Sequence, residues 1–158
     1  MVSENQIIQE YHHLLMLDND TDKEKQWIKT HQPKAAGLST IHFHILSYLE
    51  KHPDVAAKQI ASELEILRGT LSKQLTVLEQ RQMIVSHQDP SDARSKHYQL
   101  TLLGGEIAKT HDQLLKLKSR MLKDHLKQFS KEELKTIQAF LVMMNHVEES
   151  QTYPKQEE

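Results

Sequence analysis

The residues of this sequence with the most obvious chemical potential are its histidines, of which there are 11 among 158 residues. Imidazole nitrogens hold a zinc ion when three or four of them, or of nearby carboxylates, converge on one point. The sequence contains no cysteine, which excludes a thiolate zinc site, a cysteine nucleophile, a thiol redox sensor and a disulfide scaffold. Any zinc site in this chain would therefore be built from imidazoles and carboxylates.

The sequence contains no complete calcium-binding loop and none of several common catalytic or nucleotide-binding motifs. Asp18, Asp20 and Asp22 have the spacing that opens a calcium-binding loop. Lys23 stands where that loop needs glycine and Lys29 where it needs glutamate, so we reject a calcium site. The H-E-x-x-H, G-x-S-x-G, P-loop and dinucleotide-binding patterns do not occur. We predict that the chain is not an enzyme.

The composition predicts long helices. Only four glycines and four prolines interrupt the sequence, and 27% of its residues are charged. The net charge is −2, which by itself argues neither for nor against a nucleic-acid partner. No apolar run approaches the ~20 residues of a membrane span, and the N-terminus lacks the pattern of a secretory signal. We therefore expect a cytoplasmic protein without a membrane partner.

The centre of the sequence predicts two short helices joined by a tight turn. A helix that starts at Ser39 ends at Pro53-Asp54, and residues 55–64 form the next, short helix. Beyond the turn at 65–66, Leu71, Leu75 and Leu78 recur at i, i+4 and i+7, which predicts a further helix. Residues 55–78 therefore have the helix-turn-helix pattern.

The periodicity then changes from helix to strand. Residues 83–85 and 98–100 flank a turn cluster at 88–92, which predicts a two-stranded hairpin, the only β signal in the chain. A long helix from 102 to about 127 follows, and the capping box of Ser130 and Glu133 starts another. The predicted fold is mainly α with a small β-hairpin wing. A further amphipathic helix near the N-terminus is indicated by a stripe of apolar residues: Ile7, Ile8, Tyr11, Leu14 and Leu15.

In a helix-turn-helix the first turns of the second helix lie in the major groove of DNA. Arg68 suits guanine O6 and N7, Gln74 could pair with adenine, and Ser72 or Lys73 suits a phosphate. Polar residues on a short helix are often no more than its solvated face, so their placement in the fold decides between these interpretations. The candidate DNA-binding residues on this helix are Arg68, Gly69, Thr70, Ser72, Lys73 and Gln74.

From about Leu38 to the end of the hairpin, the sequence resembles the MarR family of bacterial winged helix-turn-helix transcriptional regulators. The resemblance rests on Leu38-Ser39, on Leu78-Glu79, and above all on Asp92-Ala-Arg94-Ser-Lys96 followed by Leu100-Thr101-Leu-Leu-Gly104. This last stretch is similar to the D-x-R…L-T-x-x-G signature of the family. The resemblance implies one domain of residues 1–158, with a DNA-binding head at 38–101, dimerisation helices at 1–32 and 102–149, and a loose tail at 150–158.

The same resemblance assigns roles to residues of the wing. Arg94 at its tip is expected to enter the minor groove, where a narrow A·T-rich stretch attracts a guanidinium group. Lys96 is expected to support it on the DNA backbone, and Asp92 to orient either Arg94 or the wing turn. The sequence departs from the family pattern at Leu67, where a capping serine is usual, and at Gln82, where glycine usually ends the recognition helix.

Partners and effectors follow from the resemblance as well. It implies a homodimeric repressor that binds a pseudo-palindromic operator in double-stranded DNA and responds to a small-molecule effector of unknown identity. His44 and His111 resemble ligand positions of the zinc-sensing branch, but Leu115 stands where that branch has another histidine. Both histidines lie between apolar residues, so we favour no metal site and predict no required cofactor, with zinc sensing as the alternative. His42, His87 and His97 are expected at the surface.

Overall fold

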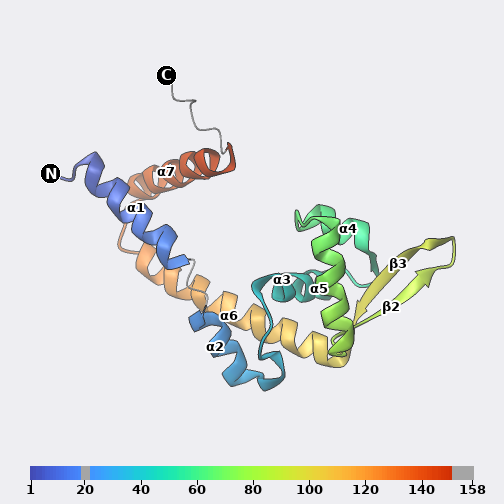
Figure 1. Ribbon diagram of the computed structural model, residues 1–158. Coiled ribbons are helices and arrows are strands. Elements are labelled where there is room, and N and C mark those ends of the chain that lie inside the picture. Colours follow the sequence, from blue (N-terminus) through green and yellow to red (C-terminus); the bar gives the residue numbers. More distant parts are fainter. Residues whose placement is uncertain (19–21, 151–158) are drawn as a thin grey trace. The chain divides into compact units, whose positions relative to one another are not determined.

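The computed structural model describes residues 1–18 and 22–150 (Figure 1). The prediction of a mainly α fold with a small β wing is confirmed. The chain divides into two compact units, one ending at Lys116 and the other starting at Leu117. Most of the predicted tail and of the aspartate run at 18–22 lies outside the described residues.

The elements are α1 (Glu4–Asp18), α2 (Asp22–His31), η1 (Pro33–Ala35), α3 (Thr40–Lys51), β1 (Val55–Ala56), α4 (Ala57–Glu63), α5 (Arg68–Gln80), β2 (Ile84–Asp89), β3 (Asp92–Leu100), α6 (Leu102–Leu126) and α7 (Lys131–Ser150).

The sheet differs from the prediction in having a third strand. Residues 55 and 56, expected to open a helix, form β1 and pair with Tyr98 and His97 of β3, so that the strand order is β1-β3-β2. A strand of two residues carries no period-2 signal, and only its tertiary partner defines it. The hairpin also extends through most of the expected turn cluster, because Asp89 Oδ1 accepts hydrogen bonds from the N–H and Oγ of Ser91 and closes a short turn.

The start of α3 shows how a polar residue becomes buried. Ser39 is the N-cap, as predicted, and its backbone N–H donates to Nδ1 of His42 at 3.0 Å. His42, expected at the surface, is only 6% exposed, because its ring completes the cap instead of facing water. Burial, together with the positive charge of Arg81, lowers the pKa of His42 below its ordinary value, which favours the neutral ring that can accept this bond.

The core of the head holds the helix-turn-helix in place. Leu71, Leu75 and Leu78 form the buried stripe of α5 that the sequence predicts. They belong to one apolar cluster with Ile45 and Leu46 of α3, Ile60 of α4, Ile84 of β2 and Ile107 of α6. Each fully buried aliphatic side chain in such a cluster contributes roughly 1.5–3 kcal/mol. The orientation of α5 is therefore set by a core to which α3, α4, β2 and α6 also contribute.

The end of α5 and the start of α6 meet where the hairpin leaves the head. Thr101 N–H donates to the Met83 carbonyl at 3.1 Å, and Thr101 Oγ1 donates to the Gln82 carbonyl at 2.7 Å. Gln82 has a φ of +58°, the left-handed conformation that its position in place of glycine predicts. Gly104 N–H in turn donates to Thr101 Oγ1. These bonds hold both ends of the wing together.

The second unit contains the rest of α6 and α7. The predicted capping box is confirmed: Ser130 N–H donates to Glu133 Oε2 at 2.7 Å, and Glu133 N–H donates to Ser130 Oγ at 3.3 Å. None of the α7 residues is buried, although the helix carries apolar side chains such as Leu141, Val142 and Val147. Within the described parts of the chain, no helix has the length and apolar character needed to cross a membrane.

The junction generates a prediction about two adjacent glycines. A Cβ on Gly104 would lie 1.9 Å from the Met83 carbonyl oxygen, whereas a Cβ on Gly105 would meet nothing within 4 Å. We expect Gly104→Ala to lower the free energy of unfolding by ~1–3 kcal/mol or more, because the backbone at Met83 or at the start of α6 must move to make room for the methyl group. Gly105→Ala should leave it unchanged or raise it by up to ~1 kcal/mol. Urea unfolding of the two variants measures the difference, and equal stability would contradict the close contact.

Candidate nucleic-acid interface

The recognition helix α5 presents two different faces. Leu71 and Leu75 are each 2% exposed and point into the core, as the sequence predicts. Arg68, Gly69, Ser72 and Lys73 are exposed, whereas Thr70 and Gln74 are half-buried. The packing of the leucines therefore leaves the polar residues of the first turns facing outward.

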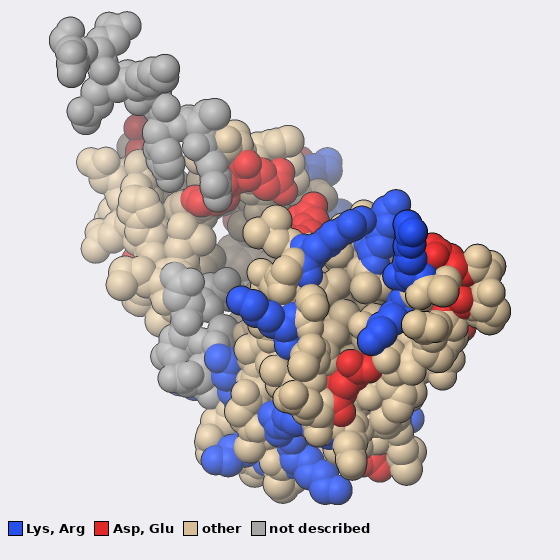
Figure 2. Space-filling model, turned by 45° about the vertical axis from the view of Figure 1, so that its right-hand side comes forward, with Lys and Arg blue, Asp and Glu red and all other residues tan. Residues whose placement is uncertain are grey.

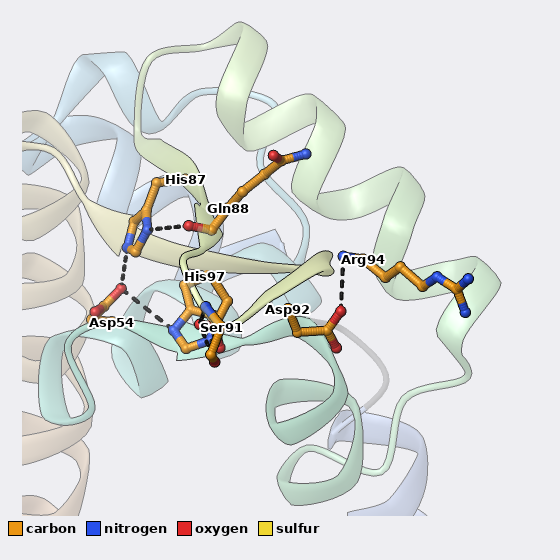
Figure 3. Close-up of polar contacts among 8 residues, drawn as sticks. Asp54, His87, Gln88, Ser91, Asp92, Arg94 and His97 are labelled. Atoms are coloured by element: carbon orange, nitrogen blue, oxygen red, sulfur yellow. Dashed lines mark hydrogen bonds and ion pairs between the residues drawn. The ribbon is translucent and has the colours of Figure 1, made fainter.

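The wing carries its charged residues on alternate positions of β3. Successive side chains of a strand point to opposite faces, so Arg94, Lys96 and Tyr98 share one face and His97 lies on the other. Asp92 Oδ1 accepts a hydrogen bond from the backbone N–H of Arg94 at 3.0 Å. Figure 3 shows the Arg94 side chain extending away from that carboxylate. Asp92 therefore contacts the backbone at Arg94 and leaves the guanidinium group available.

The two elements enclose a cleft of about 420 Å³ between α5 and the wing. The structure brings five of the candidate residues together at this cleft: Arg68, Ser72, Asp92, Arg94 and Lys96. Gly69, Thr70, Lys73 and Gln74 do not line it and lie elsewhere on α5. Leu71, Leu75 and Tyr98 form part of its apolar lining.

A cation that the sequence analysis missed also lines the cleft. Lys58 in the first turn of α4 joins Arg68, Arg94 and Lys96, so four positive side chains accompany the single carboxylate of Asp92. The first helix of a helix-turn-helix crosses the DNA backbone, and this rule could have pointed to Lys58. Figure 2 shows Lys and Arg side chains bordering a hollow on the face in view, with acidic side chains among them. The chain of net charge −2 thus concentrates positive charge beside its recognition helix.

His44 and His111, the candidate zinc ligands of the sequence, do not form a complete metal site. The ring centroids of His44 and His111 are 6.2 Å apart, with His44 exposed and His111 buried. His111 stacks on Phe43, and its Nδ1 lies 2.8 Å from Ser47 Oγ. No third ligand gathers with the two histidines in the portion of the chain that is described. Zinc sensing by this pair stays the alternative to the prediction that no metal is required.

Comparison with known proteins places the head in a family. A model described as MarR family matches residues 36–95. Two uncharacterized HTH-type transcriptional regulators of Bacillus subtilis are each 27% identical to this chain. The alignment covers 74% of this chain and 82% of YvnA in one case, and 72% of this chain and 78% of YxaD in the other.

Solved structures share the fold at lower identity. Lactococcus lactis ZitR, described as a zinc-responsive MarR family member, is 22% identical with a TM-score of 0.74, covering 90% of this chain and 96% of ZitR. Streptococcus pneumoniae FabT in complex with DNA is 24% identical with a TM-score of 0.73, covering 94% and 100%. The adhesin competence repressor of Streptococcus pyogenes is 19% identical with a TM-score of 0.71, covering 92% and 97%.

The fold of this chain is a winged helix-turn-helix, and its cleft between α5 and the wing is lined by cations. These two features are typical of winged-helix DNA-binding proteins. Within that class, the family match, the sequence relatives and the shared fold agree. Residues 36–95 match the MarR family model, and over most of its length the chain is similar to HTH-type transcriptional regulators and has the fold of solved MarR family structures.

The N-terminus of α5 generates a stability prediction. Leu67 occupies the N-cap position, where it is 81% exposed and makes no side-chain capping bond. A serine there could accept a hydrogen bond from the first turn, so Leu67→Ser should raise the free energy of unfolding by ~0.5–1 kcal/mol. Leu67→Ala removes the exposed side chain without adding a cap and serves as the control in urea unfolding. Equal effects of the two substitutions would show that capping is not the cause.

Proposed function

We propose that this chain is a homodimeric repressor that binds a pseudo-palindromic operator and releases it when a small effector binds. The observation that carries the proposal is the cleft between α5 and the wing, where four cations stand beside one carboxylate. Polyanionic DNA is the partner that such a surface on a winged helix favours. The chain acts by binding and catalyses no reaction.

The proposed contacts divide between groove and backbone. Arg68 at the start of α5 reads a guanine in the major groove, and Gln74 pairs with adenine. Ser72, Lys73 and Lys96 contact phosphates, with Gly69 and Thr70 lining the approach of the helix to the groove. Arg94 enters the minor groove, with its backbone held by Asp92. We add Lys58 as a further phosphate contact.

Exposed apolar side chains support the proposed dimer. Large apolar residues stand in water on α1, on the second half of α6 and on α7, among them Ile8, Leu14, Met121, Leu122 and Val147. A second copy packed by two-fold symmetry would cover such stripes, and a particle of twice the 18.4 kDa chain mass is expected in sedimentation. Two heads related in this way read half-sites about one helical turn, ~34–36 Å, apart.

The effector acts, in this proposal, on the spacing of the two heads. Because both half-sites must fit at once, a small hinge movement would cost several kcal/mol of DNA affinity. The lack of cysteine excludes thiol oxidation as the trigger. ZitR, of the same fold, is described as zinc-responsive, and zinc is therefore one effector to test here.

The test is selection of bound duplexes from a random DNA pool, run in parallel with zinc and with chelator. A two-fold symmetric site with half-sites about one turn apart is expected. A site recovered only with zinc would support the metal-responsive alternative, which His44→Gln and His111→Gln variants would then assign. If no site is recovered at moderate salt, either with zinc or with chelator, the proposal is overturned.

Arg94→Ala is expected to weaken specific binding by ~1–3 kcal/mol, because it removes a guanidinium group from the minor groove. Fluorescence anisotropy with the selected operator measures the loss. Arg120→Ala, which removes an arginine of α6 outside the head, is the matched control. An operator affinity equal to that of the unaltered chain would remove Arg94 from the interface.

Lys73→Ala is expected to weaken binding to all sequences alike, because the residue contacts phosphate. The slope of log K against log salt should become shallower by about one unit. Lys123→Ala, an exposed lysine of α6, should leave the slope unchanged. If Lys73→Ala instead relaxed the preference at one base pair, Lys73 would be a base-reading residue.

A further inference from the structure

Two histidines and an aspartate gather on the face of the wing that does not line the DNA-binding cleft. His87 Nε2 lies 2.5 Å from Asp54 Oδ1, and His97 Nδ1 lies 3.7 Å from the same oxygen (Figure 3). One ligand atom from each of the three residues lies within 4.8 Å of the others. The hydrogen bond with Asp54 raises the pKa of His87 above its ordinary value and lowers that of Asp54.

The fold itself produces this grouping. His87 and His97 are directly opposed in the pairing of β2 with β3, so their side chains stand next to each other on one face of the sheet. Asp54 lies in the turn between α3 and β1, with a φ of +64°, a conformation that aspartate tolerates better than most residues. Because β1 pairs with β3, that turn lies beside the two histidines.

The second nitrogen of each ring is held by an oxygen. His87 Nδ1 lies 3.3 Å from the carbonyl oxygen of Gln88, and His97 Nε2 lies 3.2 Å from Asp89 Oδ2. When these nitrogens donate and a metal ion displaces the proton that His87 Nε2 donates to Asp54, His87 Nε2 and His97 Nδ1 both direct lone pairs at the ion. Metal-binding histidines are oriented in this way, by a carbonyl or carboxylate that accepts the bond from the other ring nitrogen.

The distances and charges suit a small divalent ion. Zinc–ligand bonds of ~2.0–2.1 Å in a tetrahedral site separate ligand atoms by roughly 3.4 Å. The two separations from Asp54 Oδ1, 2.5 and 3.7 Å, lie on either side of that value, and all three ligand atoms lie within 4.8 Å of one another, so side-chain adjustments would bring them onto one ion. Asp54 and Asp89 supply two negative charges, and Asp54 and His87 side chains are each 44% exposed, which leaves a path from solvent.

We propose that Asp54, His87 and His97 bind one zinc-like divalent transition-metal ion on the wing, with Asp89 orienting His97. A bound ion would link three segments of the head: the turn after α3, β2 and β3. Arg94 and Lys96 point to the opposite face of β3, so the ion would not occupy the cleft. Figure 3 shows Arg94 extending away from the three ligands. The proposed site is separate from the His44 and His111 pair.

The test is isothermal titration of the full-length, chelator-treated chain with Zn²⁺. One ion per chain is expected for the unaltered protein. The His87→Gln/His97→Gln variant should bind more than ~100-fold more weakly, since loss of an orienting residue alone typically costs ~10–100-fold. Asp89→Asn should fall within that smaller range, and Asp54→Asn tests the carboxylate while keeping a residue that tolerates a positive φ.

Control variants separate this site from other histidines. His44→Gln/His111→Gln should retain the wing site, and its zinc affinity should equal that of the unaltered chain. Urea unfolding without metal verifies that each variant folds, including the control variant, in which the replaced His111 is buried. Zinc binding of the His87→Gln/His97→Gln variant that matches the unaltered chain would overturn the proposal, as would the absence of saturable binding in the unaltered chain.

Discussion

The contact between Gly104 and the Met83 carbonyl is the constraint on which the head depends. The hairpin leaves the core immediately after Met83 and returns immediately before Thr101, so both ends of the wing converge at this point. Thr101 bonds to the carbonyls of Gln82 and Met83, and α6 can begin against them only because position 104 has no side chain. The start of α6 is therefore held against the point where the hairpin leaves and rejoins the head.

The wing uses the alternation of a β-strand to separate two kinds of chemistry. One face of β3 carries Arg94 and Lys96 toward the cleft, while the other places His97 opposite His87. An overall charge of −2 hides this arrangement, because a composition does not record on which face of a strand a charge lies. The proposed DNA-binding surface and the proposed metal site thus both use residues of the hairpin without sharing one.

Much of the head and part of the candidate interface could be predicted from the sequence. Helix caps at Ser39 and Ser130 and the leucine spacing of α5 are local signals, so these elements could be predicted from neighbouring residues. Arg68, Ser72, Arg94 and Lys96 were expected as contacts, and they line one cleft. Lys58 was missed, since a lone lysine at the start of a short helix carries no signal of its own.

What the sequence by itself determined was most of the helices, the hairpin and the family signature, because each depends on residue types within a few positions. The tertiary structure decided β1, the burial of His42 and the meeting of Asp54 with His87 and His97. A two-residue strand has no periodicity, and a histidine becomes buried only when its neighbours in space close over it. Asp54 lies 33 positions from His87, and only the register of three paired strands brings them together.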